Sequence, residues 1–215
     1  MKSYGQFCGL ARALDLIGDR WSMLIIRDLF SGPLRFGDLR EGLPGIPTNI
    51  LTSRLNQLID GGVVLRSADA GGGRAVVRYR LTEHGAALAG PLSALGRWGA
   101  STMVEPAEGE VVTDRSLAAA LLAGHTGRRM RRRVFQIEAD ESAAHARVSG
   151  STLEVGAGAA EAPDLVVAGP GLRQLLAHTV TPGQALRSKQ IQITGPRALL
   201  DEFTTAFHVP LEPES

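Results

Sequence analysis

The chain has 215 residues, with 23 basic and 22 acidic side chains, and its length predicts one or two domains of ordinary size. One cysteine, Cys8, and five histidines without H-E-x-x-H or similar spacing exclude an internal disulfide and argue against a metal site. No apolar run approaches the roughly 18 residues of a membrane helix, and no secretory signal follows Met1. We therefore expect a cytoplasmic protein without a metal, a cofactor or a membrane partner.

The charge is divided unevenly along the chain. Residues 1–104 hold 12 basic and 8 acidic side chains, whereas residues 105–215 hold 11 and 14. Only the first part therefore suits a polyanionic partner. The stretch 105–113 is acidic, contains Pro and Gly and lacks apolar periodicity, which predicts a linker between a domain over 1–104 and a domain over 114–210.

Helical spacing of apolar residues predicts that the first domain is mainly α. Helices are expected from Cys8 to about residue 17 and over 21–30, 36–40 and 48–59, with a Gly- and Pro-containing turn over 43–47. In the last helix Leu51, Leu55, Leu58 and Ile59 share one face. The opposite face carries short hydrogen-bonding side chains, and this order of short helix, turn and polar-faced helix indicates a helix-turn-helix that enters the major groove of DNA.

Two strands are expected after this helix, over 63–66 and 76–81, separated by a glycine-rich stretch. Because the second strand alternates apolar and basic residues, the hairpin suits a basic wing that contacts phosphates or the minor groove. For Arg54 two interpretations stay open, a phosphate contact or a structural partner of a carboxylate. The predicted DNA-contacting residues are Arg35, Thr48, Asn49, Thr52, Ser53, Arg54, Arg74 and Arg78.

A closing helical segment follows Thr82, with a kink or break expected at Gly90-Pro91. Its apolar residues are Leu88, Leu92, Leu95 and Trp98. Their spacing is compatible both with packing against a partner helix and with an intramolecular core.

Residues 4–103 resemble the HxlR-type winged helix-turn-helix regulators. The resemblance rests on Cys8, A13-L-D-L-I-G-D-R-W21, L34-R-F-G-D-L39, G45-I46, L51-T-S-R-L55, Y79-R-L-T-E-H-G85 and W98-G99. It implies a homodimer, built largely from the first and last helices, that binds inverted-repeat operators in double-stranded DNA, most commonly as a repressor. The wing departs from the Pro-rich version usual in the family. Cys8 lies where some members have a thiol that responds to oxidants or electrophiles; packing as a small residue is the alternative.

The second domain is predicted to be α+β with a mixed sheet. A helix is expected over 116–123, strands over 134–137, 144–148, 152–155, 164–168 and 191–193, and helices over 172–178 and after Gly195-Pro196. Residues 114–210 resemble the sterol-carrier-protein-like fold through this order of elements and through Q190-I-Q-I-T-G195 leading into L199-L-D-E-F203. The resemblance implies an apolar tunnel.

A hydrophobic small molecule or lipid in that tunnel is the expected effector of DNA affinity. The ligand-binding residues expected on the last helix are Leu199, Leu200, Phe203 and Phe207. The alternative is a redox- or electrophile-sensing regulator that acts through Cys8, with the second domain as a ligand-free interaction module. No Gly-x-Ser-x-Gly elbow or phosphate loop occurs, so we expect no catalytic residues and no enzyme.

The run Arg128-Arg129-Met130-Arg131-Arg132-Arg133 is unusual in an acidic domain. A solvated strand entry, extra phosphate contacts and an anionic head-group site all remain open for it.

Overall fold

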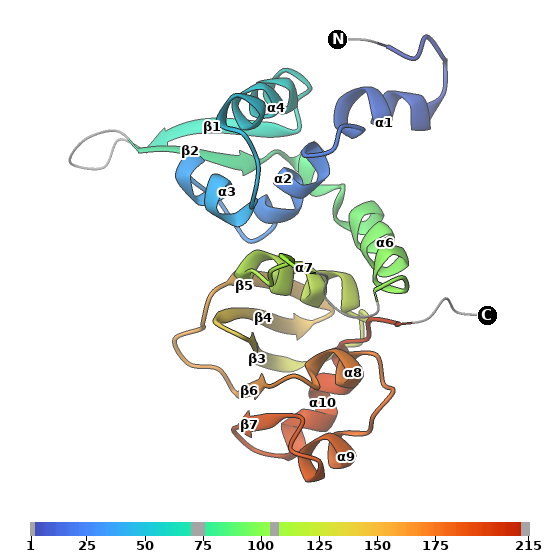
Figure 1. Cartoon of the computed structure of the whole chain (residues 1–215), viewed down its shortest axis with the longest axis vertical. Helices are drawn as coiled ribbons and strands as arrows, with labels where there is room; N and C mark the ends of the chain where they lie inside the picture. The colour runs from blue at the N-terminus through green and yellow to red at the C-terminus, as the bar shows by residue number, and fades with distance from the viewer. Residues whose placement is uncertain (1–2, 70–75, 104–107, 212–215) are drawn as a thin grey trace. The chain divides into compact units, whose positions relative to one another are not determined.

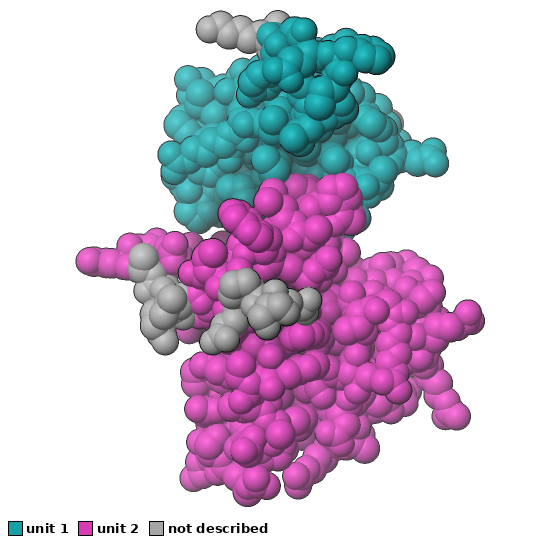
Figure 2. All heavy atoms as spheres, turned by 90° about the vertical axis from the view of Figure 1, so that its right-hand side faces the viewer, with its two compact units in different colours: residues 1–89 teal, residues 90–215 magenta. Residues whose placement is uncertain are grey.

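The computed structural model describes residues 3–69, 76–103 and 108–211. It divides into two compact units, residues 1–89 and residues 90–215, which Figure 2 shows in teal and magenta. Within the described residues, no helix is both long enough and apolar enough to cross a membrane.

The first unit is a winged helix-turn-helix, as predicted. Its elements are α1 (Gly9–Ile17), α2 (Ser22–Leu29), α3 (Phe36–Gly42), α4 (Thr48–Asp60), β1 (Val64–Asp69), β2 (Val76–Leu81) and α5 (Glu83–Ala86), and Figure 1 labels all of them except α5. β1 and β2 form an antiparallel hairpin in which Val64 is opposite Leu81. Leu34 forms an isolated antiparallel β-bridge to β2, in which its N–H donates to the carbonyl of Tyr79 at 2.9 Å and its carbonyl accepts the N–H of Tyr79 at 2.8 Å. The wing is thereby attached to the start of α3.

The core of the first unit explains why α4 has a fixed position. Leu51, Leu55 and Leu58 recur at helical spacing and are at most 1% exposed. They share the core with residues of α2 and α3 such as Ile25 and Leu39. Fully burying a leucine is worth about 1.5–3 kcal/mol, so one face of α4 is strongly held and the opposite face is left to solvent.

The second unit is an α+β arrangement of a mixed five-stranded sheet and helices. Its elements are α6 (Ala89–Ala100), α7 (Asp114–Gly124), β3 (Met130–Ala139), β4 (Ser142–Gly150), β5 (Thr152–Ala157), β6 (Leu165–Ala168), α8 (Leu172–Leu176), α9 (Pro182–Arg187), β7 (Gln192–Thr194) and α10 (Ala198–Ala206). The strand order is β5-β4-β3-β6-β7. β3 runs parallel to β6 and the other neighbouring strands are antiparallel, so the predicted mixed sheet is confirmed.

One face of this sheet carries the core of the second unit. Phe135 and Ile137 of β3 point to the side where Phe203 of α10 and Leu121 of α7 are buried. On the other face Gln136 accepts a hydrogen bond from the N–H of Ala160 at 2.8 Å. The alternation of strand residues thus separates an apolar layer under the helices from a more polar layer.

Two local features differ from the sequence expectation. The closing helical segment breaks at residues 87–88, between α5 and α6, and not at Gly90-Pro91. Pro91 lies in the first turn of α6, where a missing N–H leaves no intrahelical bond unmade. Contacts also place α6 with the second unit, since the guanidinium of Arg97 donates to the carbonyl of Ala123 at 2.7 Å.

Candidate nucleic-acid interface

The first half of α4 presents a compact group of short polar side chains. Thr48, Asn49, Thr52 and Ser53 are all exposed. The hydroxyl of Thr52 donates to the carbonyl of Thr48 at 2.9 Å, while the side chains of Asn49 and Ser53 make no hydrogen bond to any described residue. Asn and Ser side chains can both donate and accept, so this surface can pair with base edges.

The turn between α3 and α4 fixes the direction in which that surface points. Gly45 has a φ of +82°, a backbone conformation that costs other residues about 1–2 kcal/mol. The N–H of Ile46 closes the turn on the carbonyl of Leu43 at 3.1 Å, and both side chains are buried. α4 therefore leaves the turn at an angle set by a glycine and two core contacts.

Arg54 is held by a carboxylate. Its Nε lies 3.1 Å from Oδ1 of Asp19, in an ion pair without hydrogen-bond alignment, and its Nη1 donates to Gln57. Asp19 also accepts the N–H groups of Trp21 and Ser22 at 3.0 and 3.1 Å. Of the two interpretations of Arg54, the carboxylate partnership is present in the structure, and it links α4 to the start of α2.

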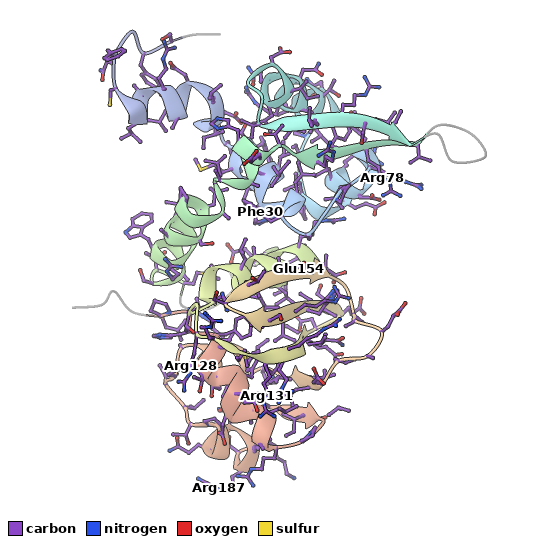
Figure 3. All side chains as sticks on the ribbon, turned by 180° about the vertical axis from the view of Figure 1, so that it is seen from behind. Phe30, Arg78, Arg128, Arg131, Glu154 and Arg187 are labelled. Atoms are coloured by element: carbon purple, nitrogen blue, oxygen red, sulfur yellow. The ribbon has the colours of Figure 1, made fainter. Side chains whose placement is uncertain are left out.

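The remaining predicted DNA contacts are spread over α3 and the wing. Arg35 is exposed at the N-cap of α3, where its backbone N–H donates to Asp38 at 2.8 Å. Arg78 lies half-buried on β2, as labelled in Figure 3. Arg74 falls outside the described residues.

Arg80 is a basic wing residue absent from the predicted contacts. It is exposed, and the register places it on the hairpin face shared with Leu65 and Arg78. The alternation of residues along β2 could have identified Arg80, because side chains two residues apart in a strand, such as Arg78 and Arg80, lie on the same face.

Cys8 is exposed just before the first residue of α1. Hydrogen bonds from the backbone N–H groups of Ala11 and Leu10 lower the pKa of its thiol below the ordinary value. A thiolate is the reactive form of cysteine, so this position favours reaction with electrophiles. Among the described residues, no group of three or more His, Cys, Asp or Glu side chains could hold a metal ion.

The residues predicted to contact an effector lie within the second unit. Leu200, Phe203 and Phe207 are at most 1% exposed, and Leu199 is half-buried. The ring of Phe203 packs against Phe135 and Phe207 at centroid distances of 5.6 and 5.3 Å. The predicted apolar face of α10 is therefore part of a filled core.

Each unit also exposes large apolar side chains. In the first unit Phe7 is fully exposed and Leu10 is 69% exposed. In the second unit α6 has no buried residue, and Leu95 and Trp98 are 47% and 70% exposed. Exposed apolar groups of this size on neighbouring turns of a helix commonly mark a protein interface.

The first half of the chain is similar to known regulators. Residues 16–107 match the model of the HxlR-like helix-turn-helix family. The HTH-type transcriptional regulator YodB of Bacillus subtilis is 35% identical over 96 residues, which are 45% of this chain and 84% of YodB. The chain belongs to the HxlR-like helix-turn-helix family. Because the match covers most of YodB, its similarity concerns the whole winged helix-turn-helix unit.

Other proteins are also similar to the first half of this chain. The HTH-type transcriptional regulator Rv3095 of Mycobacterium tuberculosis is 40% identical over 100 residues, or 45% of this chain and 60% of the relative. The matched part thus spans less than two thirds of that relative. The crystal structure of PA1607 is 42% identical, covering 50% of this chain and 73% of PA1607, with a TM-score of 0.44. The structure of the redox regulator HypR in its oxidized form is 30% identical, covering 46% of this chain and all of HypR, with a TM-score of 0.43.

Proposed function

We propose that this protein is a transcriptional regulator that binds duplex DNA, with α4 in the major groove and the β1–β2 hairpin against the phosphates. The observation that carries the proposal is the exposed group Thr48, Asn49, Thr52 and Ser53 at the start of α4. These side chains are short and stand on a helix whose opposite face is buried. They therefore need little side-chain ordering before they meet base edges, and recognition helices contact bases with their N-terminal residues.

Affinity and sequence preference come from different residues in this proposal. Phosphate contacts supply most of the affinity and bases supply the specificity. Arg35, at the N-cap of α3, and Arg80, on β2, are exposed arginines and are assigned to phosphates. Arg54 is assigned chiefly to holding α4, because its guanidinium is already engaged by Asp19 and Gln57.

A homodimer forms part of the proposal. The exposed Phe7 and Leu10 near and on α1 and the exposed Leu95 and Trp98 on α6 are the surfaces that a second copy would cover, in line with the family resemblance. Sedimentation of the full chain should give a dimer, and replacing Leu95 and Trp98 together by serine should shift it to a monomer. If the Leu95→Ser, Trp98→Ser variant stays dimeric, α6 is not part of the dimer interface.

Selection of bound sequences from a random duplex pool tests the DNA proposal. A dimer should enrich an inverted repeat whose half-sites are about 34–36 Å, or one helical turn, apart or a multiple of that distance. Enrichment of no sequence would contradict it. Placing the enriched site over a promoter and measuring transcription with and without the protein tests repression, which we expect.

For the effector we keep a hydrophobic small molecule in the second unit, with Leu199, Leu200, Phe203 and Phe207 as its contacts. Because this face is packed into the core, such a ligand has to displace the ring contacts of Phe203 with Phe135 and Phe207. Cys8 is the second candidate. The second unit has the α+β architecture and mixed sheet on which the ligand proposal rests. Cys8 is favoured by its exposure and lowered pKa. Release of the operator by diamide in the wild type but not in Cys8→Ser would assign sensing to the thiol. A lipid retained through purification would favour the second unit.

A further inference from the structure

An open groove of about 460 Å³ lies in the second unit between the start of β3 and α10. One wall is formed by the arginine-rich beginning of β3. The other is a stripe of α10 at helical spacing, formed by Ala198, Asp201, Glu202 and Thr205. Figure 3 labels Arg128 and Arg131 at this end of the unit. The groove has the volume of a small-molecule site, since such sites are commonly about 300–1,000 Å³.

The groove carries an excess of positive charge. Its lining holds four arginines, Arg128, Arg129, Arg131 and Arg133, against Asp201 and Glu202, which leaves a net charge of +2. This is unexpected in a half of the chain that has more acidic than basic residues. Neighbouring guanidinium groups repel one another, and a bound anion relieves that repulsion.

One arginine of the lining is paired with Glu202, and the other three are available to a ligand. Arg133 is half-buried and bonds to Glu202 twice, Nε to Oε2 at 3.0 Å and Nη2 to Oε1 at 3.3 Å. This ion pair links β3 to α10, and the charges of Arg133 and Glu202 neutralise each other. Within the described part of the chain, the side chains of Arg128, Arg129 and Arg131 have no hydrogen bond or ion pair, and all three are exposed.

We propose that this groove binds a small organic phosphate through Arg128, Arg129 and Arg131. Guanidinium groups present planar pairs of N–H donors that match phosphate oxygens. A phosphate monoester carries about −1.5 to −2 charges at neutral pH and three acceptor oxygens, which balances the net charge of the lining, whereas a single carboxylate balances only half of it. Met130 and Ala198 line the same groove and provide apolar contacts for the organic part. The groove belongs to the second unit, whereas α4 belongs to the first, and the ligand of the groove is a candidate regulatory signal.

Calorimetric titration of the full chain with inorganic pyrophosphate, in low-salt buffer without phosphate, tests the proposal. The wild type should bind, and the Arg128→Gln, Arg131→Gln double variant should bind at least about tenfold more weakly, because charge-assisted hydrogen bonds are lost. Both side chains are exposed, and an unchanged circular dichroism spectrum should show that the variant folds.

The matched control removes two positive charges without touching the groove. Arg132 is exposed in the same run but is not part of the lining, and Arg187 is exposed on α9. The Arg132→Gln, Arg187→Gln variant should keep wild-type pyrophosphate affinity. An equal loss in this control would overturn the proposal, because it would show a diffuse charge effect.

Two further results would also overturn it. The first is no pyrophosphate binding by the wild type. The second is weaker binding of a non-operator duplex by the Arg128→Gln, Arg131→Gln variant with unchanged pyrophosphate affinity, which would make the cluster a nucleic-acid surface. Since pyrophosphate binding is measured without DNA, its failure leaves the proposed DNA-binding function untouched.

Discussion

Asp19 should stabilise the first unit by capping the start of α2, where it also accepts the hydroxyl of the buried Ser22, and by an ion pair with α4. It caps the start of α2 by accepting the N–H groups of Trp21 and Ser22, and it pairs with Arg54 of α4. Loss of such a cap costs about 1 kcal/mol. The ion pair is partly exposed, with side-chain exposures of 27% and 23%, so it is worth about 0.5 kcal/mol after solvent screening. Asp19→Ala should therefore lower the free energy of unfolding by at least about 1.5 kcal/mol, since it also leaves the buried hydroxyl of Ser22 without its acceptor.

Asp19→Ser separates the two contributions. Serine can still cap the helix but cannot pair with Arg54, so it should cost only about 0.5 kcal/mol. Urea unfolding followed by tryptophan fluorescence measures both values. In a common Trp98→Phe background Trp21 is the remaining tryptophan and reports on the first unit. A wild-type midpoint for Asp19→Ala, or an Asp19→Ser variant as destabilised as Asp19→Ala, would contradict these contributions of Asp19.

Three other variants test single features. Gly45→Ala should destabilise the first unit by about 1 kcal/mol because its φ is positive, and an unchanged urea midpoint would argue against that strain. Arg80→Gln should weaken binding to all duplexes and reduce the salt slope by about 1, whereas Arg187→Gln in the second unit should leave both unchanged. Cys8 should be alkylated by iodoacetamide with a lower apparent pKa in the folded chain than in urea, since backbone N–H groups favour its thiolate; equal values would contradict this.

The helix-turn-helix was predictable because its signals are local. Leu51, Leu55 and Leu58 repeat at helical spacing, and Gly45 marks the turn before them. Local periodicity determines which face of α4 is buried. The ion pair between Asp19 and Arg54 joins residues far apart in the sequence, so their partnership depends on how α4 packs on the start of α2, which no sequence spacing encodes.

In the second unit, too, local sequence signals were predictable and long-range contacts were not. Its strands were predictable from alternation, but α9 was not, because it is a short helix with one buried residue, Ala185. The apolar face of α10 was also predictable. The apolar pattern of α10 does not distinguish a closed core from a ligand tunnel, because both require an apolar residue at position 203. The contacts of Phe203 with Phe135 and Phe207 depend on the tertiary fold.

The most direct test of the account is the ratio of affinities for the selected operator and a scrambled duplex, measured by fluorescence anisotropy at one salt concentration. Asn49→Ala and Thr52→Ala should each reduce this preference by about 1–3 kcal/mol if their side chains contact bases. Their affinity for the scrambled duplex should stay at the wild-type value. Asn56→Ala, an exposed change in the second half of α4, is the matched control and should keep the preference. A wild-type chain without preference, or Asn49 and Thr52 variants that retain it in full, would contradict the assignment of α4 as the recognition helix.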